Sequence, residues 1–385
     1  MRRLLLVNLL DAFIAGAYTL MIPLLLVERN MNITTIGVVF SVLPLVFVVS
    51  RLFFAASADS LGFRKFFNLN AAGNFVSVVL YSLSSSSTSY ALARGVQGVK
   101  EASLWAVNRN AAYEIAGDQN ADVASRIIFV RALPLALGAI ASGFLIFWVG
   151  FTPVFIILAF LSVLIFVPAS MLRIGGKEKE SILFEVIKKL DPTSVSKTVW
   201  SASIVMCFYF LASSLTIGFV LPIFLRSRGL GYWEIGILLA AYNALGALLL
   251  LLTAQKVLTV KNAIIVQALL YLPAALIIPL SDGWLMTVMI VLMAIAEWTS
   301  YMTMESVVVN AVRGCENTAT AISFLFTPGQ LATMVGFVLA GLLVEMYGYT
   351  APFWAAGMFF VTYSASAWLM LKDGDARKGQ TAQSI

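Results

Sequence analysis

Residues 4–27 read LLLVNLLDAFIAGAYTLMIPLLLV, an apolar stretch that contains one charged side chain, Asp11. The hydrocarbon core of a bilayer is about 30 Å thick, so a helix needs roughly 20 apolar residues to cross it. Inside that core every backbone polar group must find its partner within the protein, which favours helices. The stretch therefore predicts a membrane-spanning helix, and it sets the fold class of the chain.

The rest of the chain repeats this pattern. Apolar residues make up 61% of its 385 residues and charged residues 11%, whereas an average soluble domain is about 45 to 50% apolar and about 25% charged. Too few polar side chains remain to cover a surface in water. We predict an all-α polytopic membrane protein with twelve transmembrane helices, at residues 4–27, 34–57, 67–86, 90–112, 124–147, 152–172, 199–225, 234–256, 262–281, 284–311, 318–344 and 350–371.

The lysines and arginines set the orientation of these spans. Cytoplasmic loops of membrane proteins carry an excess of both residues. Of the 25 in the chain, 17 fall on one side of the predicted membrane and only Arg29, Arg226 and Arg228 on the other. We therefore expect a multi-pass protein of the plasma membrane with both termini in the cytoplasm. The one long polar connection divides it into a six-helix bundle at 1–172, a cytoplasmic linker at 173–198, a second bundle at 199–371 and a cytoplasmic tail at 372–385.

The two halves of the chain resemble each other. Prolines and glycines recur in the same order at a shift of 198 or 199 residues, among them Pro23 with Pro222, Gly37 with Gly236, Gly138 with Gly336 and Gly143 with Gly341. We interpret this as an internal duplication that gives two pseudo-symmetric bundles. Two parallel repeats allow alternating access when one half rocks against the other, so this architecture favours a transporter.

The composition also excludes several kinds of chemistry. The chain has no histidine, which rules out histidine metal sites and Ser-His-Asp or Cys-His catalysis. No Walker-type Gly-x4-Gly-Lys-Ser/Thr loop occurs, so ATP is not expected to drive the protein directly. The net charge of +6 is spread over short loops, and membrane orientation explains it better than nucleic acid does. We expect no enzyme activity, no metal, no cofactor and no nucleic-acid partner.

The loop after the second span reads AASADSLGFRK from residue 55. Gly62 suits a tight turn, and Asp59 can cap the start of a helix. This loop resembles the signature of the major facilitator superfamily, with Ala55 in place of the usual Gly and Ser60 in place of the usual Arg. The resemblance implies that Asp59, Gly62 and Arg64 form a gating loop that steadies the outward-facing state.

The fourth span carries a second resemblance to this family. Its Arg94-Gly95-Val96-Gln97-Gly98 stretch is similar to the family's Arg-x-x-Gln-Gly motif, which implies a part for Arg94 in proton coupling. The Gly-Pro pairing that is typical of antiporters in the fifth span is not matched. In length, layout and hydropathy the resemblance covers nearly the whole chain and implies the superfamily's fold, like that of compact prokaryotic drug and metabolite exporters.

Charged side chains inside the spans are candidates for function, because an ionisable group in the bilayer needs a partner or a watery cavity. On the fourth span Arg94, Gln97, Glu101, Trp105 and Asn108 share one helical face, with Lys100 about 100° away. On the tenth span Glu297 and Tyr301 share a similar face. We predict that a central cavity for proton coupling is lined by Asp11, Arg94, Lys100, Glu101 and Glu297, with substrate contacts from Tyr18, Gln97, Trp105, Asn108 and Tyr301.

The chemistry at these carboxyl groups has two interpretations. In the first, at least one of Asp11, Glu101 and Glu297 binds and releases a proton as its access to water changes, and Glu101 is the first candidate, followed by Asp11. In the second, Arg94, Lys100 or Arg131 holds these acids in permanent ion pairs.

The leading functional hypothesis is a proton-coupled secondary transporter that exports amphipathic organic compounds. The alternatives are an importer of a sugar or other nutrient, proton-coupled or facilitative, and an organic anion carrier. A receptor with a transporter fold is a further alternative. The expected partners are a small-molecule substrate, protons and the lipid bilayer, and we expect a monomer.

Overall fold

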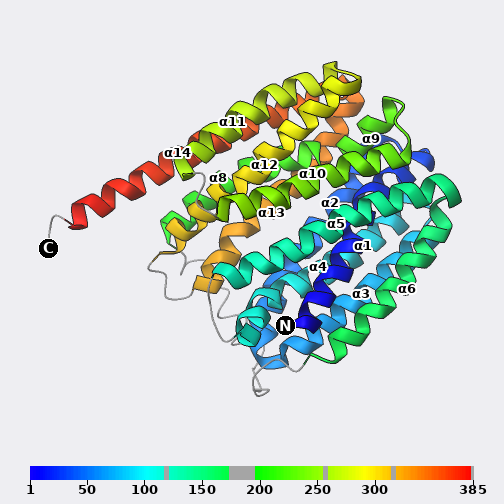
Figure 1. Cartoon of the computed structure of the whole chain (residues 1–385), viewed down its shortest axis with the longest axis horizontal. Helices are drawn as coiled ribbons and strands as arrows, with labels where there is room; N and C mark the ends of the chain where they lie inside the picture. The colour runs from blue at the N-terminus through cyan, green and yellow to red at the C-terminus, as the bar shows by residue number, and fades with distance from the viewer. Residues whose placement is uncertain (117–120, 173–195, 255–258, 314–317, 383–385) are drawn as a thin grey trace.

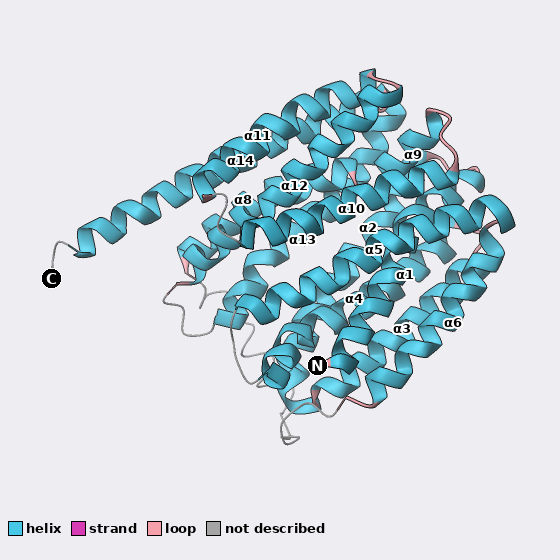
Figure 2. Cartoon of the chain, viewed as in Figure 1, coloured by secondary structure: helices cyan, strands magenta, loops and turns pink. Residues whose placement is uncertain are grey.

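The computed structural model describes residues 1–116, 121–172, 196–254, 259–313 and 318–382. Within these ranges it describes the backbone but not the side chains of residues 55, 56, 58–60, 109, 113, 116, 121–129, 246–254, 318–320 and 373–382. The described part contains helices and turns without strands (Figures 1 and 2). Its helices are α1 (Arg2–Glu28), α2 (Ile33–Leu61), α3 (Phe63–Leu83), α4 (Ser87–Ala116), α5 (Ala121–Val149), α6 (Phe151–Ser170), α8 (Lys197–Thr216), α9 (Val220–Ser227), α10 (Tyr232–Ala254), α11 (Val260–Ile277), the 3-10 turn η2 (Ile278–Leu280), α12 (Gly283–Val312), α13 (Thr318–Tyr347) and α14 (Thr350–Ala382).

These elements agree with the predicted spans to within a few residues, except that α14 continues beyond residue 371. Ten spans within the described residues are long and apolar enough to cross a membrane, with α8 and α9 together forming one of them. The helices α4 and α10 complete the twelve that the sequence predicts. The predicted linker lies outside the described residues except for 196–198.

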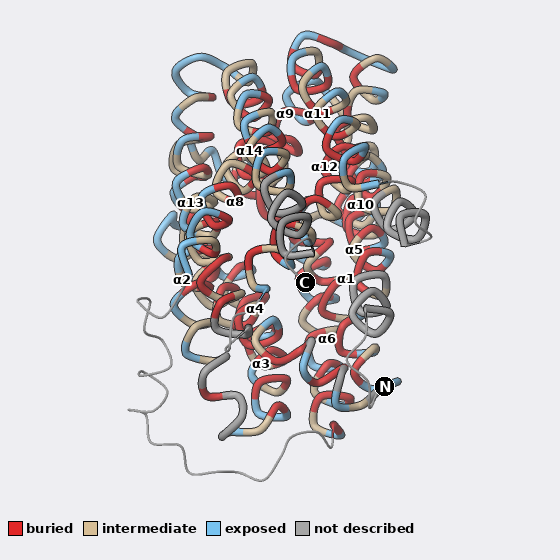
Figure 3. The backbone as a smooth tube through the Cα atoms, turned by 90° about the vertical axis from the view of Figure 1, so that its left-hand side faces the viewer, coloured by how far each residue is buried: buried red, intermediate tan, exposed pale blue. Residues whose placement is uncertain are grey.

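The outer helices present apolar side chains to the surroundings. On α6, Ile156 is 67% exposed and Phe160 64%, and Val163 and Val167 continue the same helical face. A soluble monomer seldom exposes an apolar stripe of this kind. A lipid environment explains it, since these side chains then contact acyl chains. Buried positions, in contrast, occur along the helices of both bundles (Figure 3).

The seventh span is interrupted, which the sequence analysis did not predict. Residues 217–219 leave the helical path between α8 and α9. The ring of Pro222 clashes with the carbonyl of the residue four positions earlier and removes a hydrogen bond, and that residue is Gly218, which itself weakens a helix. The equivalent Pro23 lies inside a continuous α1 and follows Thr19 at the same spacing. The same proline therefore breaks one repeat and is tolerated in the other.

The two bundles meet mainly through two symmetric helix pairs, α5 with α10 and α2 with α13. Both pairs approach most closely at the end of the bundle remote from the chain termini, which we call the far end. A Cβ atom added to Gly143 would lie 2.5 Å from the carbonyl oxygen of Tyr232, and one added to Gly341 would lie 2.8 Å from that of Ile33. Gly143 and Gly341 are equivalent positions in the sequence repeat. The internal duplication therefore accounts for both close helix contacts at the far end.

Aromatic side chains close the same interface. Phe40 of α2 packs against Phe219, at the break before α9, with ring centroids 5.1 Å apart, and against Phe337 of α13 at 5.8 Å. The backbone N–H of Thr34 donates to the carboxylate of Glu345 at 3.3 Å. The far end of the molecule is therefore closed by backbone approach, ring packing and a hydrogen bond between the two bundles.

Gly143→Ala is expected to shift the protein away from this closed far end. The added methyl group meets a backbone carbonyl that cannot rotate aside, and overpacking of this kind costs about 1 to 3 kcal/mol. The ratio of the closed arrangement to the open one should then fall by about 5- to 150-fold. Spin labels at the exposed positions Ser85 and Tyr347, with Cys207 and Cys315 replaced by alanine, report the separation of the two bundles.

The matched control for this change is Gly95→Ala. A Cβ atom there would find its nearest neighbours, on Val42 and Val46, at an ordinary 3.8 Å. Both variants change a helical glycine to alanine, so they share any gain in helix propensity. Equal label distances in the two variants would show that close approach at Gly143 does not hold the far end shut.

Candidate functional site

Asp11 is the centre of a buried polar cluster in the N-terminal bundle. It lies on α1 and is fully buried. The Lys100 ammonium from α4 lies 3.0 Å from its Oδ1, and the Arg131 guanidinium from α5 lies 2.9 Å from its Oδ2. Asn70 and Asn74 of α3 donate to Oδ1 at 3.1 and 3.0 Å. Four helices therefore contribute polar atoms to one carboxylate cluster.

The same lysine also binds the second candidate acid. The Nζ atom of Lys100 lies 2.7 Å from Oε1 of Glu101, whose side chain is 15% exposed. Two carboxylates and two cations thus balance one another around Asp11. Neutralising one member of such a buried ion pair would leave the charge of the other without a partner, which costs free energy. This favours the interpretation in which Asp11 and Glu101 stay in permanent ion pairs.

Two asparagines and a tryptophan extend this cluster along α4. Asn8 and Asn108 exchange reciprocal amide hydrogen bonds of 2.8 and 2.7 Å, and Arg131 donates to Oδ1 of Asn8 at 3.3 Å. The Arg131 guanidinium also lies 5.0 Å from the ring centroid of Trp105, within cation–π range. Asn108 is buried, whereas Trp105 is 41% exposed, so of this face Trp105 is the best placed to contact a substrate.

Arg94 lies apart from these acids. Its guanidinium donates to Gln97 at 3.0 Å and covers the ring of Phe40 at 3.6 Å from the centroid. Gln97 also accepts a 2.7 Å hydrogen bond from the hydroxyl of Tyr81, whose ring packs against Tyr18. Because Phe40 belongs to the aromatic contact between the bundles, Arg94 is linked to the closed far end.

Glu297 occupies a different environment in the C-terminal bundle. Its carboxylate on α12 is buried and accepts from the hydroxyls of Ser213 at 2.8 Å and Tyr209 at 3.4 Å, both on α8, and from Tyr242 on α10. Among the side chains that the structure describes, no lysine or arginine forms an ion pair with Glu297. Of the three candidate carboxyl groups, this one is held by neutral donors alone.

Aromatic rings surround Glu297. Tyr301 packs on Trp298 with centroids 5.0 Å apart and on Tyr209 at 6.3 Å. The indole N–H of Trp298 donates to the carbonyl oxygen of Tyr242 at 3.1 Å, which fixes the tryptophan between α12 and α10. Tyr301 and Trp298 are half-buried. They give the carboxyl group an apolar, partly accessible wall.

The structure therefore separates the predicted site residues into groups. Asp11, Lys100, Glu101, Trp105 and Asn108 belong to one cluster with Arg131, and Glu297 and Tyr301 belong to another. Tyr18, Gln97 and Asn108 are at most 5% exposed and are satisfied by neighbours in their own bundle. In this conformation Asp11 is sealed inside its bundle and does not line a cavity.

The predicted gating loop is partly described. Gly62 has φ +76°, a left-handed conformation that suits glycine, as the sequence indicated. Asp59 lies within α2, and the N-cap residue of α3 is Gly62. The side chain of Asp59 lies outside the described residues, and Arg64 is exposed.

Several residues of these clusters were missed by the sequence analysis. Asn70, Asn74 and Ser77 recur at i, i+4 and i+7 on the third span, and amides on one face of an apolar helix could have indicated a buried partner. For Ser213 the sequence offers no such signal, because single serines are common in transmembrane helices. Its role depends on where α8 meets α12.

Two bundles of long apolar helices, with charged groups buried inside them where lipid could not solvate them, define a polytopic membrane transporter. The sequence matches the family model of the Major Facilitator Superfamily over residues 4–314, and the chain belongs to that family. The fold and the family indicate a transporter and not an enzyme. No curated protein matches the sequence.

Solved structures share the whole fold. The nucleoside transporter NupG is 15% identical, covers 96% of this chain and 98% of its own, and superposes with a TM-score of 0.72. The human organic anion transporter MFSD10 (TETRAN) is 18% identical over 95% of this chain and 99% of its own, with a TM-score of 0.68. A structure from work on proton-dependent oligopeptide transporters is 12% identical over 97% and 98%, with a TM-score of 0.75. At these identities the likeness shows the fold alone.

Proposed function

We propose that the protein is a proton-coupled secondary transporter that exports amphipathic organic compounds, in particular cationic ones, by alternating access. The observation that carries this proposal is the setting of Glu297, a buried carboxyl group held by three hydroxyls and, among the described side chains, by no cation. Hydroxyl groups can donate to the carboxylate and can also reorient when it is protonated. Such a group can change its charge without leaving a cation unpaired.

Proton coupling follows from a change in the surroundings of this group. Burial disfavours the charged form of a carboxyl group and contact with water favours it. Rocking of the bundles that exposes Glu297 to one face and then to the other would therefore load and release a proton. By its place in the sequence Glu101 is the first candidate for this role, but its 2.7 Å contact with Lys100 makes Glu297 the better one.

The aromatic wall supports an amphipathic, cationic substrate. Tyrosine and tryptophan faces attract cations, and Tyr301 and Trp298 lie beside the carboxyl group. A cation and a proton would then compete for one carboxylate, which couples their movements in opposite directions. This exchange is export when the proton gradient points into the cell.

The alternative substrates have weaker support from the site. An organic anion carrier would need available cations. Lys100 and Arg131 are both paired with Asp11, and Arg94, which lies apart from these acids, donates to Gln97 and is covered by the ring of Phe40. A sugar importer would need free amides, but Gln97 is bonded to Tyr81 and Arg94, and Asn108 is bonded to Asn8. Nucleoside, organic anion and proton-dependent oligopeptide transporters share this fold, so the fold by itself selects none of them.

The charge distribution supports the orientation. With the Lys- and Arg-rich end in the cytoplasm of a plasma-membrane protein, the closed far end would face outward, as alternating access requires of an inward-facing state. Arg64, which the family resemblance associates with the gating loop, then lies on the cytoplasmic side. We expect the monomer to be the transporting unit, since each chain carries both bundles.

Purified protein in liposomes with an imposed pH gradient tests this function. A panel of one lipophilic organic cation, one organic anion, a nucleoside, a sugar and a dipeptide should give gradient-dependent accumulation of the cation alone. One pH unit corresponds to about 1.4 kcal/mol, so one-for-one exchange should concentrate the cation about tenfold. Accumulation of the sugar or nucleoside without any effect of the gradient would contradict the proposal.

A further inference from the structure

A cavity of about 530 Å³ opens between α11, α12 and α14, at the end of the bundle opposite the closed far end. It lies where three spanning helices reach one membrane surface. Val260 and Lys261 belong to the first turn of α11, Arg313 directly follows α12, and Lys372 ends the apolar part of α14. The volume falls within the range of small-molecule sites, about 300 to 1,000 Å³.

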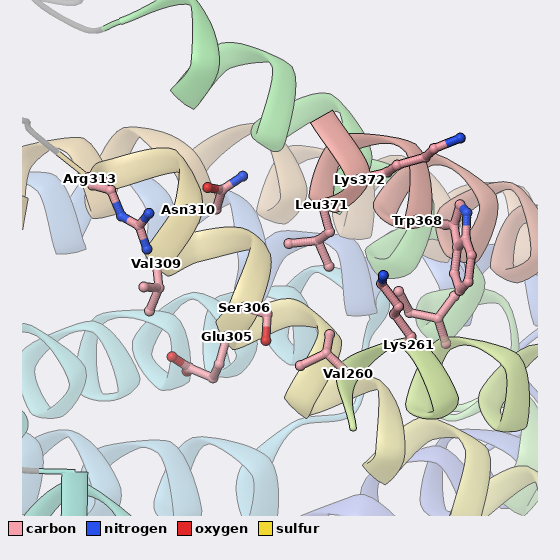
Figure 4. Close-up of a pocket in the computed structure, with 11 residues that line it drawn as sticks. Val260, Lys261, Glu305, Ser306, Val309, Asn310, Arg313, Trp368, Leu371 and Lys372 are labelled. Carbon is pink, nitrogen blue, oxygen red and sulfur yellow. The ribbon is translucent and has the colours of Figure 1, made fainter. Parts of the chain in front are cut away.

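The lining of this cavity is basic on one part and apolar on another. Lys261, Arg313 and Lys372 come from the three different helices, and Glu305 is the one carboxylate among the lining residues. Figure 4 shows Arg313 on one side of the cavity and Lys261 and Lys372 on the other. The lining therefore carries two net positive charges, and the first turn of α11 adds the positive end of a helix dipole.

The apolar part contains side chains suited to an acyl chain. Trp368, Val309 and Leu371 line the same cavity, and Val309 is 55% exposed. Tryptophan is enriched at the level of lipid headgroups. Basic pockets between transmembrane helices on the cytoplasmic side suit anionic headgroups. A soluble anion would use the cations alone, whereas an amphiphile would use the cations and the apolar wall together.

We propose that this cavity binds an anionic phospholipid, with the phosphate headgroup at the basic part of the lining, which is Lys261, Arg313 and Lys372, and an acyl chain along the apolar part. Asn310, which also lines the cavity, can donate to a phosphate oxygen. The bound lipid would bridge α11, α12 and α14. This site is distinct from the Glu297 cluster, and its existence does not depend on the proposed transport function.

The test uses the full-length protein in a neutral detergent, with thermal unfolding followed as short-chain lipids are added. Phosphatidylglycerol should raise the unfolding temperature and phosphatidylcholine should not. In the variant K261Q/R313Q/K372Q the apparent affinity for phosphatidylglycerol should fall by about 100-fold, because each cation near an anionic lipid contributes roughly fivefold.

The matched control is R2Q/K65Q/K197Q, which removes one arginine and two lysines that are exposed at the same end of the molecule but outside the cavity. Its affinity for phosphatidylglycerol should change less than about threefold. An equal loss in both triple variants would overturn the proposal in favour of general surface electrostatics.

A second variant and a second ligand complete the test. Val309→Trp fills the apolar part of the cavity and keeps all three cations, so it should also abolish the effect of phosphatidylglycerol. Inorganic phosphate and glycerol phosphate, which have no acyl chain, should stabilise the protein little. If glycerol phosphate binds as tightly as phosphatidylglycerol, or if Val309→Trp leaves lipid binding intact, the lipid assignment is wrong.

Discussion

Glu297→Gln is expected to abolish proton-driven accumulation while leaving substrate movement down its own gradient. Glutamine keeps the shape of the side chain. Its amide oxygen can still accept from the hydroxyls on one side, and its NH2 group can donate to a reoriented hydroxyl on the other, but it cannot bind and release a proton. In liposomes with a gradient of one pH unit, accumulation should fall from about tenfold to no accumulation. Proton release during substrate addition should disappear at the same time.

Two further variants make this result specific. Glu101→Gln should keep gradient-dependent accumulation. The carboxylate of Glu101 lies 2.7 Å from Lys100, and in the permanent ion-pair interpretation this contact is structural. Glu28→Gln removes an exposed carboxylate at the end of α1 and should change nothing. If Glu101→Gln loses proton coupling and Glu297→Gln retains it, the proton carrier is in the N-terminal bundle.

Asp11→Asn is expected to destabilise the protein by about 3 to 5 kcal/mol. The substitution keeps the size of the side chain but leaves Lys100 and Arg131 as buried cations with one fewer carboxylate, and breaking a buried pair on one side carries a cost of this order. Thermal unfolding in detergent should show a large drop in midpoint. The double variant Asp11→Asn/Arg131→Met should recover at least half of the loss, because it removes the cation paired with Asp11 and leaves Lys100 with Glu101.

An exposed ion pair provides the matched control for Asp11. Asp282 binds Arg228 at 2.7 Å, and its side chain is 73% exposed. Asp282→Asn should cost no more than about 1 kcal/mol, as is usual for surface pairs. If Asp11→Asn proves no more destabilising than Asp282→Asn, the charge of Asp11 is not required for the fold and its place in the proton cycle is open again.

The two results together separate two kinds of buried carboxyl group. Asp11 is surrounded by two cations and two asparagines on neighbouring helices, so its charge is part of the structure. Glu297 is surrounded by hydroxyls and rings, an environment that allows its charge to change in the proposed cycle.

The sequence by itself determined the membrane class, the helix boundaries and the repeat. Long apolar runs such as 4–27 have one low-energy arrangement in a bilayer, because backbone groups must bond within their own segment. Spacing along a helix also placed Glu101 and Trp105 on one face. These properties depend on residues close together in the chain, so they can be predicted from the amino-acid sequence alone.

Only the tertiary structure decided which charged groups are neighbours. Helical spacing says that Asp11 and Glu297 point away from lipid, but it does not say that Lys100 and Arg131 meet the first and that Ser213 and Tyr242 meet the second. Those partners lie on other helices, up to 120 residues away in the case of Asp11 and Arg131. Their meeting depends on how the helices within each bundle pack, and close approaches such as Gly138 of α5 on Phe13 of α1 set that packing. Packing depends on two surfaces at once, so no single segment encodes it.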